Sequence, residues 1–138
     1  MDAHIKKVYV PMTETGFYIL LCLQKEMHGY GIVQKVSEMT NGEILLSPGT
    51  MYGSLGKMEK DGLIRFVAEE EKRKIYHITD LGREVLQLEM KRIERLYRNM
   101  REELQLKRKR KFLNGLRLRN MKRSRNICDR SIRQAGSL

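Results

Sequence analysis

With 138 residues, the chain has the length of one domain with an appendage, which is enough to bury a core without stabilising cross-links. Its two cysteines are too few for a disulfide framework, and no apolar run approaches the roughly 18 residues that cross a bilayer. The N-terminal residues are not followed by an apolar segment of signal-peptide form. We therefore expect a cytoplasmic protein that does not enter a membrane.

The net charge of +11 suggests a polyanionic partner, but this charge is unevenly distributed. Residues 1–104 hold 16 Lys and Arg against 16 Asp and Glu, whereas residues 105–138 hold 12 cations against one acid. The body of the chain is thus neutral, so specific binding by the body must come from individually placed residues.

Two helices are predicted in the first third of the chain. Thr13 is suited to cap a helix, and the apolar residues that follow at helical spacing predict a helix over 13–26. A glycine-containing segment interrupts the pattern, which resumes over 30–40. Asn41 and Gly42 favour left-handed backbone and are predicted to end this second helix.

Ser47 and Pro48 predict the start of a third helix, because serine caps helices and a proline at the first helical position forfeits no hydrogen bond. One face of this helix carries the apolar residues Met51, Leu55 and Met58. We assign that face to the core, and we expect the helix to end at Gly62.

Two β-rich runs, at 63–67 and 75–78, flank charged residues at 69–74 and predict a β-hairpin. Three helices followed by a two-stranded wing are the order of a winged helix-turn-helix, whose third helix is sized for a DNA major groove about 12 Å wide. The same order also fits a small α+β domain without a nucleic-acid role, so it leaves both alternatives open.

A fourth helix is predicted from Thr79 and Asp80 onward. Its apolar residues recur at heptad spacing, which is typical of a helix that packs against another helix. These residues, the predicted dimer interface, are Leu86, Met90, Ile93, Tyr97, Met100 and Leu104. Beyond them, five consecutive cations repel one another, and we expect a basic tail that is weakly structured or disordered.

The predicted fold class is therefore mainly α with a small β-hairpin. We expect a winged helix-turn-helix DNA-binding domain at 1–79, a long C-terminal dimerisation helix at 80–104 and the basic tail at 105–138.

The face of the third helix opposite its core residues carries groups that suit DNA. Hydroxyls and lysines meet phosphates and base edges, and glycines, each costing about 1 kcal/mol in a helix interior, permit close approach of a partner. The predicted DNA contacts are Thr50, Tyr52, Gly53, Ser54, Lys57 and Lys60, with Arg73 and Lys74 on the wing. Alternatively, the lysines form a solvated face and the glycines allow tight helix packing.

Four motifs in this order resemble the PadR family of bacterial transcriptional regulators. They are HGYGI at 28–32, SPGTMYGSL at 47–55, KDGLI at 60–64 and RKIYHITDLG at 73–82, and the similarity extends over about 13–104. The resemblance implies a winged helix-turn-helix repressor that is a homodimer and binds a double-stranded DNA operator with two-fold symmetry. It also implies release of the DNA by a small hydrophobic or aromatic effector in some members.

The sequence departs from that family in its dimer helix. Multidrug-binding relatives carry a tryptophan there, whereas this chain has no Trp and has Ile93 at the matching position. If an effector pocket exists, we expect it between two protomers, lined by Phe17, Leu21, Ile93 and Tyr97. A fully packed interface without a cavity is the alternative.

Other functions remain open beside the repressor. The chain could be a protein-interaction module built on a winged helix, or a general nucleic-acid binder driven by its tail. No nucleophile–base pair, metal-ligand spacing or phosphate loop stands out in the sequence. We therefore predict a protein that is not an enzyme and that needs no cofactor or metal.

Overall fold

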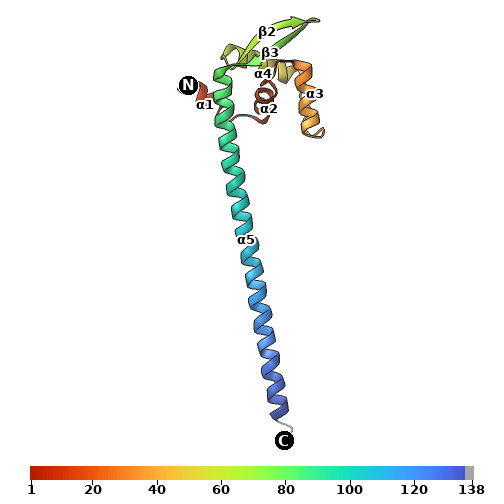
Figure 1. Ribbon diagram of the computed structural model, residues 1–138, viewed down its shortest axis with the longest axis vertical. Helices are drawn as coiled ribbons and strands as arrows, with labels where there is room; N and C mark the ends of the chain where they lie inside the picture. Colours follow the sequence, from red (N-terminus) through yellow and green to blue (C-terminus); the bar gives the residue numbers. More distant parts are fainter. Residues whose placement is uncertain (136–138) are drawn as a thin grey trace. The chain divides into compact units, whose positions relative to one another are not determined.

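The computed structural model describes the backbone of residues 1–135, with side chains for 1–105 and 108–121. It confirms a mainly helical chain with a small antiparallel sheet (Figure 1). In chain order the elements are α1 (Ala3–Tyr9), α2 (Glu14–Cys22), β1 (Met27–His28), α3 (Gly29–Met39), α4 (Pro48–Lys60), β2 (Ile64–Glu70), β3 (Arg73–Ile78) and α5 (Asp80–Ala135). Two compact units divide at Ile93 and Glu94.

Side-chain caps fix the helix starts that the sequence predicts. The hydroxyl of Thr13 accepts a hydrogen bond from the Gly16 N–H at 3.2 Å, and that of Ser47 accepts one from the Thr50 N–H at 3.3 Å. Beyond α3, Gly42 has a positive φ of 78°, as the predicted helix stop requires. The starts of α2 and α4 are thus confirmed.

The predicted end of the first helix, at residue 26, is wrong. Helix α2 ends at Cys22, and Met27 and His28 form β1, which pairs with Tyr76 and Ile75 of β3. The helix ends early because Met27 and His28 pair with a strand that is about 50 residues away in the sequence. The pattern of apolar residues near residue 26 contains no information about such a distant partner.

Helix α1 was absent from the sequence-based expectations. It is seven residues long, and the carboxylate of Asp2 caps it by accepting the His4 N–H at 3.1 Å. So short a helix is marginal by propensity alone. Its stability comes from burial of Ile5 and Tyr9 against the core, which a local pattern does not show.

The sheet has the order β1-β3-β2 and contains the predicted hairpin. The strands extend farther into the charged segment than predicted, because Glu69 faces Lys74 and Glu70 faces Arg73 across the ladder. Such opposite-charge pairs stabilise neighbouring strands. Only two residues remain in the turn, Glu71 and Lys72, and both have positive φ.

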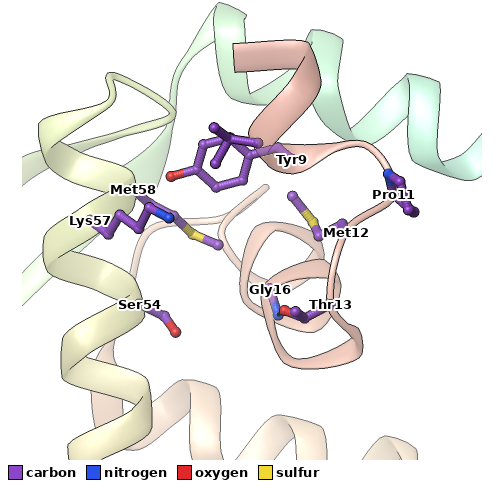
Figure 2. A pocket seen from close by; sticks show the side chains of 9 residues that line it. Tyr9, Pro11, Met12, Thr13, Gly16, Ser54, Lys57 and Met58 are labelled. Carbon is purple, nitrogen blue, oxygen red and sulfur yellow. Dashed lines mark hydrogen bonds between the residues drawn. The ribbon is translucent and has the colours of Figure 1, made fainter. Parts of the chain in front are cut away.

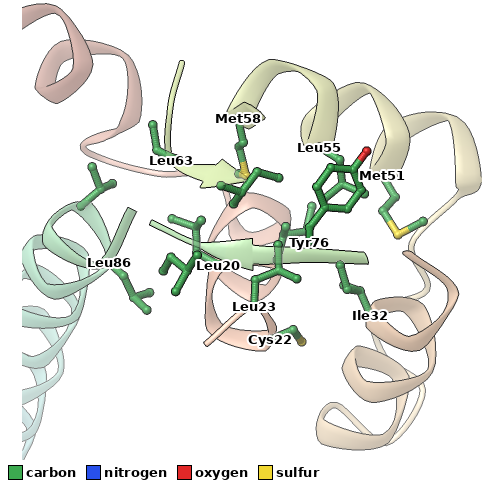
Figure 3. Packing of buried hydrophobic residues seen from close by; sticks show 14 of the residues in the cluster. Leu20, Cys22, Leu23, Ile32, Met51, Leu55, Met58, Leu63, Tyr76 and Leu86 are labelled. Carbon is green, nitrogen blue, oxygen red and sulfur yellow. The ribbon is translucent and has the colours of Figure 1, made fainter. Parts of the chain in front are cut away.

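One hydrophobic cluster holds the helices and the sheet together (Figure 3). Met51, Leu55 and Met58 of α4 are buried together, as their spacing predicts. Figure 3 shows Leu55 and Met58 directed toward the sheet and Met51 toward the start of α3. Leu20 and Leu23 lie at its centre and are fully buried. Helix α4 is therefore fixed by one face, which leaves its other face outward.

The first turns of α5 belong to the same core. Val85 is fully buried and Leu86 is 3% exposed, so the compact unit continues past the predicted boundary at residue 79. The sequence analysis placed Leu86 in the dimer interface. Because the core of its own chain covers this side chain, Leu86 is not available to a second protomer.

Helical backbone continues through α5 to Ala135, whereas the sequence analysis predicted weak structure after Leu104. Lysine, arginine and leucine, which dominate this segment, are good helix formers, and the prediction gave more weight to repulsion among the cations. The last part of the predicted tail, 136–138, lies outside the described residues. In the described chain, no helix combines the length and the apolar character that crossing a bilayer demands.

Candidate nucleic-acid interface

The outward face of α4 is open along its length. A Cβ atom added to Gly49, Gly53 or Gly56 would meet nothing within 4 Å. Tyr52, on the same side, is 59% exposed. Tight packing against another helix therefore does not explain these glycines among the described residues, although that was one alternative from the sequence.

The polar groups predicted on α4 differ in how they are held. Thr50 is exposed, and its hydroxyl accepts a hydrogen bond from the Ser47 hydroxyl at 2.8 Å. Ser54 is half-buried, whereas Lys57 and Lys60 are exposed in the last turn. The helix thus presents hydroxyls near its start and ammonium groups near its end.

Lys57 is positioned by Tyr9 of α1, which the sequence analysis did not identify. The Lys57 ammonium lies 5.7 Å from the centroid of the Tyr9 ring (Figure 2). The Tyr9 hydroxyl donates a 2.6 Å hydrogen bond to Asp61, the C-cap of α4. Burial, together with this hydrogen bond, raises the pKa of Tyr9 above its ordinary value.

A cavity of about 240 Å³ lies beside this contact, between α1, α2 and α4 (Figure 2). Its lining includes the apolar residues Val8, Met12 and Met58, and Ser54 and Lys57 contribute polar groups. The C-terminal half of α4 is therefore supported from behind by the N-terminal segment of the chain.

On the wing, Arg73 and Lys74 are both exposed, as their predicted role requires. The Arg73 guanidinium lies 5.5 Å from the ring centroid of Tyr30, at the start of α3. Tyr30 is 53% exposed, and the sequence analysis did not select it as a contact. An exposed aromatic residue in the HGYGI motif was the available signal.

The predicted dimer seam on α5 is solvent-exposed apart from Leu86. The exposed fractions are Met90 49%, Ile93 39%, Tyr97 54%, Met100 51% and Leu104 51%. Large apolar side chains that recur along one face of a helix normally mark a surface that another molecule covers.

Two of the four residues predicted for an effector pocket line one cavity of about 310 Å³. Phe17 of α2 and Ile93 of α5 lie there with Met12 and Tyr18. Leu21 is half-buried and does not line this cavity, and Tyr97 belongs to the other compact unit.

The same cavity is bordered by an ion pair that the sequence analysis missed. Glu89 is fully buried, and both its oxygens accept hydrogen bonds from Arg92, the shortest at 2.8 Å. These bonds raise the pKa of Arg92. The described residues contain no cluster of three or more His, Cys, Asp or Glu that could hold a metal ion.

The three helices α2, α3 and α4 with the hairpin β2–β3 define a winged helix-turn-helix protein, with one outward helix beside a charged wing. The family model described as the transcriptional regulator PadR-like family matches residues 19–88. The chain therefore belongs to the PadR-like family of transcriptional regulators, a class of regulatory proteins and not of enzymes.

Two curated relatives are similar to this chain over about half of its length. Transcriptional regulator Rv3488 of Mycobacterium tuberculosis is 32% identical over 78 residues, which are 54% of this chain and 70% of that protein. An uncharacterized protein of Lysinibacillus sphaericus is 36% identical over 70 residues, 48% of this chain and 64% of that one. The chain spans less than two thirds of the length of two of the curated relatives that it matches.

Among solved structures, a PadR family transcription regulator from Clostridium difficile R20291 is similar with a TM-score of 0.59. It is 28% identical, and the match covers 67% of this chain and 99% of that one.

Proposed function

We propose that this chain is a sequence-specific DNA-binding repressor that acts as a homodimer. The observation that carries the proposal is the outward face of α4, where a Cβ atom added to Gly49, Gly53 or Gly56 would meet no described residue within 4 Å. Two of these glycines lie inside the helix, where each costs about 1 kcal/mol relative to alanine. A duplex that approaches the helix backbone in the major groove accounts for them.

The surrounding charges support the same partner. Lys57 and Lys60 lie in the last turn of α4, Arg73 and Lys74 lie on the wing, and all four cations are exposed. Because residues 1–104 are neutral overall, this grouping is local and is not a result of bulk charge. Phosphate contacts of this kind fix the position of a protein on DNA, while Thr50, Tyr52 and Ser54 are suited to read base edges.

The test is selection of preferred duplexes from a random library by the full chain, followed by mobility-shift titrations at several salt concentrations. Lys60→Ala should weaken binding to every duplex and lower the salt slope by about one unit, as loss of one phosphate contact predicts. Thr50→Ala should change the preference at particular base pairs. Lys25→Ala, an exposed lysine outside α4 and the wing, is the matched control.

The competing functions give different outcomes in this experiment. Binding without sequence preference that disappears when Arg108, Lys109, Arg110 and Lys111 are all changed to glutamine would identify a binder driven by the tail. No binding to any duplex would favour a protein-interaction module instead.

We further propose that a small hydrophobic or aromatic effector binds where the cavity at Phe17 and Ile93 meets a second protomer. Met12, Phe17, Tyr18 and Ile93 give this cavity an apolar and aromatic side that suits such a ligand, next to the Glu89–Arg92 ion pair. Two copies that read one operator need their half-site spacing fixed near one DNA turn, roughly 34 Å. A ligand that favours a different protomer arrangement would lower operator affinity. Ile93→Trp should create binding of flat aromatic dyes and keep the dimer, whereas dimer loss without dye binding would contradict the pocket.

A further inference from the structure

One cavity that the proposed function does not use lies beside α4. It has a volume of about 240 Å³, lies between α1, α2 and α4, and adjoins the contact between Tyr9 and Lys57 (Figure 2). Every residue that lines it belongs to the first compact unit of one chain. It is distinct from the cavity at Phe17 and Ile93, although Met12 lines both. We refer to it as the α4 cavity.

Aliphatic and thioether side chains form the apolar part of the α4 cavity. Val8, Met12 and Met58 contribute them. A Cβ atom added to Gly16 of α2 would lie 3.1 Å from Cγ of Met12 and 3.4 Å from Cε of Met58, so both methionines approach this glycine. Methionine is flexible and adapts to a ligand. Because drug-sized ligands occupy roughly 300–1,000 Å³, this cavity fits a smaller apolar body.

Tyr9 supplies the aromatic ring of the α4 cavity, and this ring is already engaged. The Lys57 ammonium lies 5.7 Å from its centroid, and its hydroxyl donates a 2.6 Å hydrogen bond to Asp61. The other cavity differs, because the rings of Phe17 and Tyr18 lie there edge to face with 6.0 Å between centroids. An aliphatic ligand therefore fits the α4 cavity better than a flat aromatic one.

The α4 cavity is lined by a cation, Lys57, and by no carboxylate among the described residues. The nearby acids are directed elsewhere. Asp61 accepts the Tyr9 hydroxyl, and Glu14 lines the cavity at Phe17 and Ile93. Glu59 is two residues, or about 200° of helix, from Lys57 and is not part of the lining. Within the described chain Lys57 forms no ion pair, so its charge is available to an anion.

A second donor lies next to this ammonium. Ser54 precedes Lys57 by three residues, which places both side chains on one face of α4. Ser54 is half-buried, and its hydroxyl has no hydrogen-bond partner in the part of the chain that the structure describes. The Thr13 hydroxyl, by contrast, already accepts the Gly16 N–H. One ammonium and one hydroxyl at the edge of an apolar cavity match a carboxylate.

From these observations we infer that the α4 cavity binds a short aliphatic monocarboxylate, with the carboxylate on Lys57 and Ser54. The hydrocarbon chain of the ligand lies against Met12 and Met58. This ligand is a second effector, bound within one protomer and separate from the effector proposed between two protomers.

Such a ligand acts on DNA binding through Lys57. The same ammonium is a predicted DNA contact, and it cannot pair fully with a ligand carboxylate and a DNA phosphate at once. Ligand and duplex should therefore weaken each other's binding by the same factor. This regulatory step rests on the proposed function, whereas the ligand site itself does not.

The first experiment titrates the full chain by calorimetry with acetate, butyrate and hexanoate. Affinity should rise about fourfold for each added CH₂ group, the factor that corresponds to about 0.8 kcal/mol per buried CH₂. The neutral 1-hexanol carries the same chain as hexanoate and should bind about tenfold more weakly, because it lacks the charge-assisted hydrogen bonds. No heat with any probe, no gain along the acid series, or equal affinity for hexanoate and 1-hexanol would overturn the inference.

Variants locate the binding site. Lys57→Gln should reduce the hexanoate affinity to that of 1-hexanol. Lys60→Gln is the matched control for this titration, since Lys60 is an exposed lysine of the same turn that does not line the α4 cavity. Ile93→Asp combined with Met100→Asp should still bind one hexanoate per chain. Loss of hexanoate binding in this double variant would place the ligand between protomers and overturn the inference.

The second experiment measures duplex affinity across a salt series with hexanoate at saturation, and with acetate at the same concentration to control for ionic strength. Hexanoate should weaken binding several-fold and lower the salt slope by about one unit, as loss of one phosphate contact predicts. In Lys57→Gln, hexanoate should change neither quantity. Hexanoate that binds the chain and leaves duplex affinity unchanged would refute the regulatory step.

Failure of the inference is distinct from failure of the proposed function. If the chain selects particular duplexes but gives no heat with hexanoate, the α4 cavity is not a ligand site and the proposed function stands. If hexanoate binds as described but no duplex is bound, the proposed function and the regulatory step fail, and the ligand site stands.

Discussion

At the scale of single residues, Tyr9 connects two segments that are far apart in the sequence. It is 7% exposed, its hydroxyl binds the C-cap of α4, and its ring faces the Lys57 ammonium. One side chain of α1 thereby helps to position the last turn of the helix that we propose reads DNA.

Tyr9→Phe should lower the free energy of unfolding by about 1 kcal/mol, because the hydrogen bond to Asp61 is lost while the ring stays. The raised pKa of Tyr9 adds a pH dependence. Ionisation is easier in the unfolded chain, where the ordinary value of 10.0 applies, than in the folded one. The contribution of Tyr9 is thus fully present below pH 10.0 and is lost as the pH rises above it.

Urea unfolding at pH 8 to 11, as an order-of-magnitude window around tyrosine ionisation, measures both effects. Tyr9→Phe should show a shallower fall in stability above pH 10.0 than the unsubstituted chain. Tyr18→Phe is the control, since the described residues contain no hydrogen bond of the Tyr18 hydroxyl. Equal slopes for the unsubstituted chain and Tyr9→Phe would contradict the raised pKa that burial and the hydrogen bond to Asp61 give Tyr9.

At the scale of elements, two glycines in neighbouring helices have opposite surroundings. A Cβ atom on Gly82, at the start of α5, would clash with the Leu63 carbonyl oxygen, whereas one on Gly56 of α4 would meet no described residue within 4 Å. Gly82 is thus required for the approach of α5 to the end of α4, and Gly56 is not required by the fold.

We expect Gly82→Ala to destabilise the chain by at least the 1–3 kcal/mol typical of overpacking, since the obstructing atom is backbone. Gly56→Ala should instead stabilise it by up to about 1 kcal/mol and weaken DNA binding by blocking close approach. Thermal melts and duplex titrations of both variants test the pair. Unchanged DNA affinity in Gly56→Ala would separate this glycine from the interface.

The sequence predicted most of the elements because their signals are local. Ser47 and Pro48 mark the start of α4, and the spacing of Met51, Leu55 and Met58 marks its buried face. What it did not predict depends on contacts between distant residues. Strand β1 exists through pairing with β3, Tyr9 acts through Asp61, and Tyr30 reaches Arg73 on the wing.

The same distinction applies to the candidate site. Exposure of Tyr52, Lys57 and Lys60 follows from helical geometry, so these residues could be selected in advance. Leu86 fits the heptad seam equally well, yet it is buried in its own chain. Periodicity gives the face of a helix but does not say which molecule covers it.

At the scale of the whole molecule, the exposed seam of α5 is the feature that a single copy leaves unexplained. Ile93→Asp combined with Met100→Asp should convert a dimer into monomers, because both charges would enter an apolar interface. Sedimentation at micromolar protein measures the outcome. Arg95→Asp is the control. Arg95 is two residues after Ile93, which places it about 200° away, on the opposite face of the helix, so this change of charge should leave the dimer intact. A double variant that still sediments as a dimer would rule out this seam.

The wing turn has a consequence for how the sequence can vary. Glu71 and Lys72 hold positive φ values of 50° and 63°, which two-residue hairpin turns normally assign to asparagine and glycine. Selection for stability alone should therefore move this pair toward Asn-Gly. Lys72 also lines a concave surface beside α4 together with Tyr52 and Arg73, so selection for DNA binding should retain a cation there. In a library randomised at both positions, the residues enriched by selection for stability should therefore differ from those enriched by selection for DNA binding. The difference would measure how much backbone strain the turn accepts in order to keep a cation at position 72.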